Sequence, residues 1–359
     1  MEPVQRKQKK TKDKKPLYIL AGFLVLFGVF IYLITRPSTK SEAIDKLKTC
    51  FNKNAVKIVW DRYEADLQKD EGFLLETRKK LTSLDLTEEE IKECRGWIPP
   101  APVSINLIIV PDLSRRIIDT LNNPNQIEND IFILQTIWKS FVGFSKFKKD
   151  TKDKLIIDVT DIDQAKGQFG KIANDLQFDL SNHKNSNRLF FTIEKDKQFE
   201  TSIREMYELA QKKPLGADYK FYLRRYLVNH LKKPTLFDNY INKVVIITDG
   251  YLEAENKPAD TKIHGFESQL HQAVSIGNIL DVITLKGLNI PKVNIDLSNS
   301  EILICEVNER RTGKGFDFEI LRAYWEDWFK RMNAKKIVFI QRELSTDVTA
   351  QKVNEFITK

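Results

Sequence analysis

Two short polar motifs in this 359-residue chain each follow an apolar run and have the donor groups of a cation site. Asp112 and Ser114 come after the run at 104–110, and Asp249 comes after the run at 243–247. An aspartate and a hydroxyl two residues apart can point the same way from one loop, and an aspartate from a neighbouring strand would face them. Such hard oxygen donors suit Mg²⁺, which keeps several waters or takes an oxygen from a partner. These three residues are therefore the candidate metal ligands.

The runs that precede these motifs are expected to be strands of an α/β domain. Short apolar runs, mostly rich in β-branched residues, predict strands at 104–110, 154–159, 188–193, 243–247, 301–307 and 336–340. Helical patterns separate them, at 128–146, 199–211, 217–232 and from about 320 to 332. Continuous apolar strands that alternate with helices are typical of a doubly wound, mostly parallel sheet flanked by helices. Ligands of such sheets bind beyond the carboxyl ends of the strands, where both polar motifs are expected.

These motifs and their order resemble a von Willebrand factor A (vWA) domain. The resemblance rests on Asp-x-Ser after the first strand, on Thr248-Asp249-Gly250 after a central strand, and on the closing strand–helix–strand order, over about residues 103–345. It implies a metal-ion-dependent adhesion site in which Asp112 and Ser114 match the first ligand loop and Asp249 matches the last ligand. It also implies that a partner protein's carboxylate completes the shell of a bound Mg²⁺. The expected function is protein binding at the carboxyl-end face of the sheet, without catalysis.

The sequence departs from the family pattern at two ligand positions. Arg116 stands where the second serine of the first loop is expected, and Ala217 stands where the family has a threonine. A guanidinium beside Asp112 could pair with it and take over the charge role of the cation. Asp218 could serve as a substitute oxygen ligand. The alternative is that these residues cap loops and form an Arg116–Asp112 ion pair, so a requirement for Mg²⁺ does not follow from the resemblance.

The amino-terminal region predicts a single-pass membrane anchor. Residues 17–34 form an uncharged apolar run of 18 residues, which at about 1.5 Å per helical residue crosses most of a bilayer core. Residues 1–16 carry +5 of the net charge of +8, so the amino terminus is expected in the cytoplasm and the main domain outside it, in the periplasm of a two-membrane bacterium. A cleavable signal peptide and a buried core helix are the alternatives. Because the basicity belongs mainly to this tail, it does not indicate nucleic-acid binding.

A helical segment is expected between the anchor and the sheet. Residues 41–97 have helical spacing and a capping box at 87–90, and the proline-rich stretch 97–102 reads as a rigid linker. In an oxidising compartment Cys50 and Cys94 could form a disulfide, with two unpaired thiols as the alternative. The expected organisation is a basic tail at 1–16, a transmembrane helix at 17–35, a helical stalk and linker at 36–102, and a vWA-like domain at 103–359.

Composition narrows the functional classes. With 42% hydrophobic and 30% charged residues the chain is not a disordered protein, and three cysteines and four histidines supply neither a disulfide scaffold nor a zinc-site spacing. The favoured function is a membrane-anchored protein-binding module, a non-enzymatic subunit or scaffold of an envelope complex. The alternative is a metal-assisted hydrolase or phosphoryl-transfer enzyme that uses Asp112 and Asp249, although no general base is evident. A structural envelope subunit without a ligand site is the third possibility.

Overall fold

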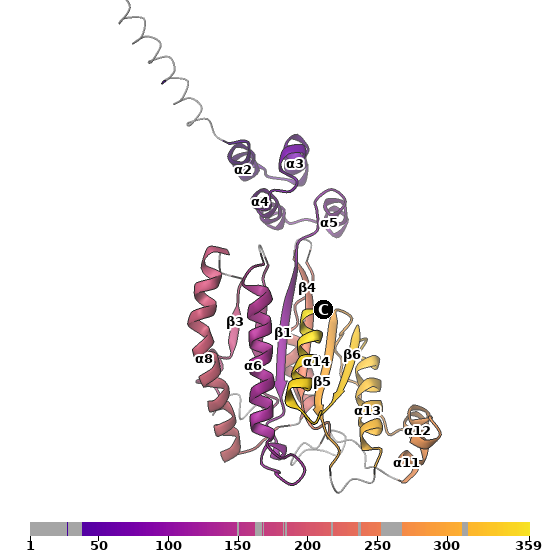
Figure 1. The fold of residues 1–359 in the computed structure, drawn as a ribbon. Coiled ribbons are helices and arrows are strands. Elements are labelled where there is room, and N and C mark those ends of the chain that lie inside the picture. Colours follow the sequence, from indigo (N-terminus) through magenta and orange to yellow (C-terminus); the bar gives the residue numbers. More distant parts are fainter. Residues whose placement is uncertain are drawn as a thin grey trace, which may run out of the picture. The chain divides into compact units, whose positions relative to one another are not determined.

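The computed structural model divides the chain into two compact units, Met1–Pro99 and Pro100–Lys359 (Figure 1). The predicted membrane segment lies outside the described residues except for Phe27. Within the described ranges, no helix combines the length and the apolar character needed to cross a bilayer. The structure describes residues 27, 38–148, 151–161, 167, 169–181, 183, 185–216, 218–235, 238–252, 268–310 and 315–359.

The first unit contains short helices that begin at side-chain caps. Ser38, Asn52 and Asp70 each accept a hydrogen bond from a backbone N–H of the first helical turn, and the predicted capping box of Thr87 is confirmed. The helices are α2 (Thr39–Thr49), α3 (Lys53–Leu67), α4 (Glu71–Thr82) and α5 (Glu88–Arg95).

Aromatic packing holds this helical unit together, without a disulfide. The ring of Trp60 stacks on Phe73 at 5.7 Å and lies 5.8 Å from the ring of Trp97. Cys50 and Cys94 are both buried and both are free thiols, so the disulfide that the sequence allowed is not formed. Burial raises the pKa of both thiols, which keeps them in the unreactive protonated form.

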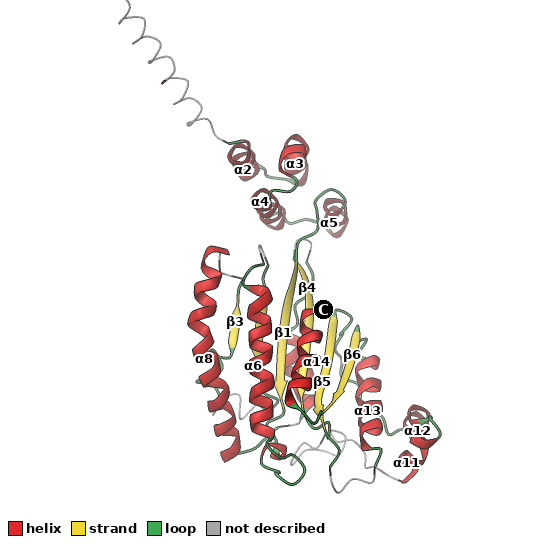
Figure 2. Cartoon of the chain, in the orientation of Figure 1, coloured by secondary structure: helices red, strands yellow, loops and turns green. Residues whose placement is uncertain are grey.

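A six-stranded sheet forms the centre of the second unit (Figure 2). Its order is β3-β2-β1-β4-β5-β6, and all neighbours are parallel except the antiparallel pair β2–β3. The central strands are buried over most of their length because helices cover both faces. The strands are β1 (Val103–Pro111), β2 (Lys154–Ile157), β3 (Gln177–Asp179), β4 (Asn239–Ile247), β5 (Ser300–Val307) and β6 (Lys336–Gln341).

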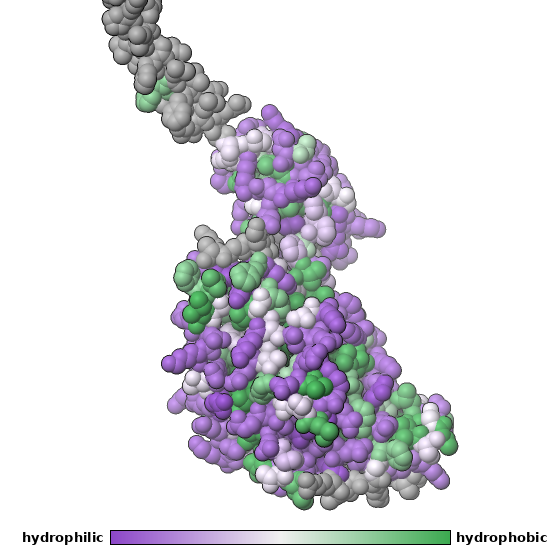
Figure 3. Space-filling model, viewed as in Figure 1, coloured by the Kyte–Doolittle hydropathy of each residue, from purple (hydrophilic) through white to green (hydrophobic). Residues whose placement is uncertain are grey.

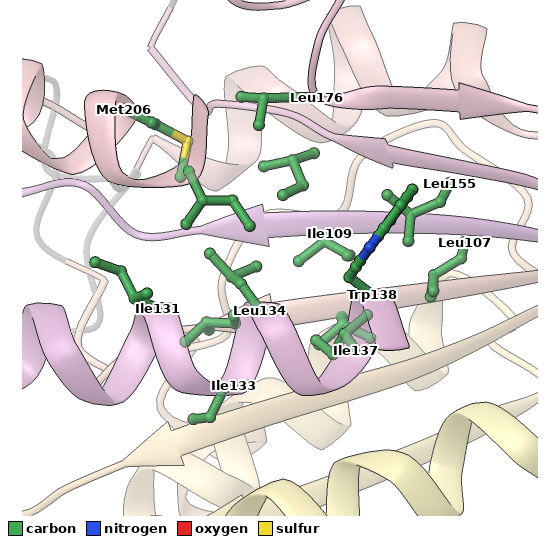
Figure 4. Close-up of a cluster of buried hydrophobic side chains, with 14 of the residues drawn as sticks. Leu107, Ile109, Ile131, Ile133, Leu134, Ile137, Trp138, Leu155, Leu176 and Met206 are labelled. Carbon is green, nitrogen blue, oxygen red and sulfur yellow. The ribbon is translucent and has the colours of Figure 1, made fainter. Parts of the chain in front are cut away.

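The helices on one face pack through a large apolar cluster (Figure 4). Leu134, Ile137 and Trp138 lie on the sheet residues Leu107 and Ile109. The helices of this face are α6 (Gln126–Ser145), α8 (Asn185–Lys212) and α14 (Thr346–Thr358).

A second apolar cluster covers the other face. Trp325, Trp328 and Phe329 are fully buried there, so the aromatic side chains of the helix predicted from about 320 to 332 belong to the core. This face is covered by α9 (Tyr219–Tyr222), the π-helix η2 (Leu223–Leu227), α10 (Val228–His230), α11 (Ser268–Ser275), α12 (Ile279–Leu285) and α13 (Asp317–Arg331).

One predicted strand is wrong. Residues 188–193 belong to α8, whose inner side carries the buried Arg188 and Thr192 while Leu189, Phe190 and Ile193 face outward. This arrangement follows helical periodicity, which a six-residue run with four apolar residues does not distinguish from a strand. The strand that pairs with β2 is instead the three-residue β3. The other five predicted strands are confirmed, and the chain has an α/β fold with a mostly parallel sheet flanked by helices.

Candidate functional site

The predicted site residues Asp112 and Ser114 lie where β1 and β4 end side by side. The Asp112 N–H donates to the Ile247 carbonyl at 2.9 Å, which extends the strand pairing by one residue. The Thr248 hydroxyl donates to Asp112 Oδ2 at 2.8 Å, and the Ser114 N–H donates to Asp112 Oδ1 at 3.0 Å. Both carboxylate oxygens of Asp112 therefore accept hydrogen bonds from the two loops. The carboxyl ends of β1 and β4 also mark the point where the crossovers change direction, which is the usual ligand position in such sheets.

Gly216 brings a third loop to the same place. Its φ is +142°, and a Cβ there would lie 3.0 Å from Thr160 Oγ1 and 3.6 Å from the Ser114 nitrogen. A side chain at this position would therefore be strained and crowded. Ala217 itself lies outside the described residues. Its neighbour Asp218 accepts the Phe221 N–H at 3.0 Å as the cap of α9, so the suggested substitute ligand has a structural role.

The buried side chain of Arg116 interacts with two aspartates, Asp112 and Asp130. Its Nε donates to the Asp112 carbonyl at 2.9 Å and lies 3.7 Å from Asp112 Oδ2. Its Nη2 donates to Asp130 Oδ2 at 2.6 Å and to the Ile247 carbonyl at 3.0 Å. The ion pair that the sequence offered as an alternative to metal binding is thus present, but the closer carboxylate belongs to Asp130. Sequence analysis missed Asp130, whose only signal is a lone aspartate on the apolar side of α6.

Asp130 is fully buried and anchors the Arg116 side chain. Tyr207 donates to Asp130 Oδ2 at 2.9 Å, and Gln126 donates to Asp130 Oδ1 at 2.6 Å. Burial raises the pKa of Asp130 to about 6, although the guanidinium of Arg116 opposes the shift. Hydrogen bonds to both oxygens satisfy this carboxylate inside the core. The network ties α6 and α8 to the first site loop.

Asp249, the third predicted ligand, forms an ion pair with Arg310. Its Oδ2 lies 3.4 Å from Nη2 of Arg310, and its Oδ1 accepts the Tyr251 N–H at 3.3 Å. The Arg310 guanidinium also covers the Tyr251 ring, 4.0 Å from its centroid. Burial, with a further contribution from the negative charge of Asp112, raises the pKa of Asp249 to about 6. The two aspartates are therefore close enough to repel each other, and both arginines offset that repulsion.

These residues fit a directly bound Mg²⁺ poorly. Carboxylates and hydroxyls are the right donor chemistry, but each carboxylate oxygen of Asp112 and Asp249 already faces a protein donor. Both side chains are also only 1% exposed. Across the part of the chain that the structure describes, no cluster of three or more His, Cys, Asp or Glu side chains could hold a metal ion.

Exposed apolar side chains lie in the loops at this end of the sheet. Ile118 and Leu121 follow β1, Phe316 precedes α13, and all three are exposed. The Asn308 amide donates to the Asn122 carbonyl at 2.8 Å, which holds the loops after β1 and β5 together. Apolar side chains around a rigid polar centre are suited to contact with another protein.

Comparisons with known proteins do not assign this chain to a family. The sequence matches no protein-family model, and no curated protein is significantly similar to it. An α/β sheet with helices on both faces supports many unrelated functions, so the fold alone does not select one. The function must therefore be argued from the site and its surroundings.

Proposed function

We propose that this chain is a membrane-anchored, non-enzymatic protein-binding module of the vWA type that acts outside the cytoplasm, as a subunit or scaffold of an envelope complex. The observation that carries the proposal is the meeting of Asp112, Ser114 and Asp249 at the ends of β1 and β4. The vWA resemblance places its adhesion site at this position. The apolar run 17–34 and the basic tail before it support the anchor.

In this proposal Arg116 and Arg310 replace the metal ion. Each guanidinium lies within 4 Å of one of the two aspartates that would otherwise need a cation to offset their charge. Partner binding then does not depend on Mg²⁺. The contact surface is the rim of Ile118, Leu121 and Phe316, and the buried ion pairs keep the loops beneath it rigid.

The hydrolase alternative has weaker support. A nucleophilic Asp112 would have to reach a substrate, yet its side chain is buried and both oxygens accept hydrogen bonds. Asp249 is buried in the same way. Phosphatase activity that an Asp112→Asn substitution abolishes would favour the alternative.

Site-specific photo-crosslinking in native membranes tests the proposal. A photoreactive amino acid replaces Leu121 in the full chain, and the matched control replaces Leu285, which is exposed on α12 and is not part of the proposed surface. We expect a discrete crosslinked partner from position 121, none from position 285, and no change with a metal chelator. Loss of the crosslink in chelator would contradict metal independence. Equal products from both positions would contradict a binding surface at this rim.

A further inference from the structure

The second unit exposes large apolar side chains at the end where its parallel strands begin. Phe147 is 73% exposed, Phe190 72%, Ile193 66% and Leu189 44%. Positions 189, 190 and 193 share the outward face of the first turns of α8. Figure 3 shows hydrophobic side chains gathered over the beginning of α8, at the upper left of this unit. We refer to these four residues as the apolar patch.

Buried contacts hold the apolar patch in one place. The Arg188 side chain is buried, and its Nη1 donates to the Lys148 carbonyl at 2.6 Å and to the Thr151 hydroxyl at 3.1 Å. These bonds fix the start of α8 beside the chain that follows Phe147. On the inner side of the same helix turns, the ring of Phe191 stacks on Phe178 at 4.8 Å. The patch is therefore presented by a rigid frame.

Lysines accompany the apolar patch. Residues 146–154 contain five lysines, of which Lys148, Lys152 and Lys154 form ion pairs with Asp153, Asp238 and Asp179. Lys146 extends over the Phe147 ring, with Nζ 4.9 Å from its centroid, and Lys197 is exposed one turn beyond Ile193 on the outward face of α8. Aromatic and aliphatic side chains bordered by lysines are the composition that binds at the interface of an anionic bilayer.

The apolar patch and the candidate site lie at opposite ends of the sheet. The Lys152 N–H donates to Ser104 Oγ, which places Lys152 beside the first residues of β1. The candidate site follows the last residue of β1, and nine residues at about 3.3 Å each separate the two ends by roughly 30 Å. The chain also enters this unit at the patch end, since β1 begins at Val103.

We propose that Phe147, Leu189, Phe190 and Ile193 insert into the interface of a bilayer containing anionic lipid. Docking in this way holds the candidate site about 30 Å away from the lipid surface, facing partners. Lys146 and Lys197 beside the patch favour anionic lipid. Entry of the chain at the patch end favours a bilayer, because the proposed anchor precedes that entry point. The inference deepens the proposed function and rests on the anchor only for this last argument.

Depth-dependent fluorescence quenching of the full chain tests the inference. Phe190→Cys carries an environment-sensitive fluorophore, and Leu285→Cys, 85% exposed on α12, is the matched control. The three native cysteines are buried and free, so labelling is directed to the introduced one. In phosphatidylethanolamine vesicles with phosphatidylglycerol, we expect a blue shift and at least twofold quenching by brominated lipid at position 190, and neither at position 285. Ile193→Asp, which places a carboxylate in the patch, is expected to remove most of the quenching.

Three results would overturn the inference: no shift at position 190, a shift without lipid quenching, or unchanged quenching in Ile193→Asp. A shift without quenching would mean that protein, not lipid, covers the patch. A label at Phe27→Cys separates failure of the anchor from failure of the patch. Quenching at position 27 alone would support the proposed membrane anchor and overturn docking of the apolar patch. Quenching at position 190 alone would support docking of the patch and contradict the anchor.

Discussion

At the residue scale, Arg116 determines the chemistry of the candidate site. Its guanidinium lies between Asp112 and Asp130, and all three side chains are almost completely buried. The sequence offered the Asp112 contact as an alternative to metal binding, because Arg116 stands in the same loop. It did not predict Asp130 or Arg310, because only the packing of α6 and the loop after β5 brings them to the site. Long-range partners of this kind leave no local pattern in a single sequence.

Removing the Arg116 charge should strongly destabilise the second unit. Arg116→Met leaves Asp130 buried without its cation, and the loss of one partner of a buried ion pair costs about 3–5 kcal/mol. In the double variant Arg116→Met, Asp130→Leu no uncompensated charge remains at that pair, so most of this loss should be recovered. Urea unfolding followed by tryptophan fluorescence measures both. A single variant that loses less than about 1 kcal/mol would contradict the assigned role.

At the element scale, the apolar runs predicted the central strands well. The runs that became β1, β4 and β5 are buried on both faces, so their residues had to be continuously apolar. The run at 188–193 contains four apolar residues beside Arg188 and Thr192, and its outward side chains remain exposed on a helix. The edge strand β3 is too short to give a pattern. Burial on both faces thus made the central strands predictable, although the less buried edge strand β6 was predicted as well.

The loop after β4 depends on Gly250. Its φ is +94°, and a Cβ there would lie 3.0 Å from Val307 Cγ1, while its carbonyl accepts the Trp325 indole N–H at 2.9 Å. Gly250→Ala should lower the free energy of unfolding by about 1–3 kcal/mol because the left-handed backbone becomes strained. Gly143 lies in α6 with no neighbouring atom within 4 Å, so Gly143→Ala should instead stabilise by about 0.5–1 kcal/mol. Thermal unfolding of the two variants measures this difference in sign, and equal effects would contradict it.

At the scale of the whole molecule, the charge distribution and the position of the site suggest one orientation. The basic residues gather before the predicted anchor, and the candidate site lies at the end of the sheet opposite to the start of β1. The proposed orientation keeps the tail in the cytoplasm and residues 36–359 outside it. This orientation does not follow from the fold alone, because the same α/β sheet could function in any compartment.

Cysteine labelling tests this orientation. A membrane-impermeant maleimide should label Leu285→Cys in intact spheroplasts and should label Gln5→Cys only after permeabilisation. The unmodified chain is the control, because its three cysteines are buried in the structure. The reverse pattern of labelling would place the main domain in the cytoplasm and contradict the proposal.

The central claim is that arginines, not a metal ion, complete the site at Asp112 and Asp249. Titration calorimetry of Mg²⁺ into the full chain tests this claim most directly, beside the variant Asp112→Asn, Asp249→Asn. The account predicts no saturable heat at millimolar Mg²⁺ in either protein, because Arg116 and Arg310 already offset both carboxylates. Saturable binding to the unmodified chain that the double variant loses would contradict it, and would show a working metal site.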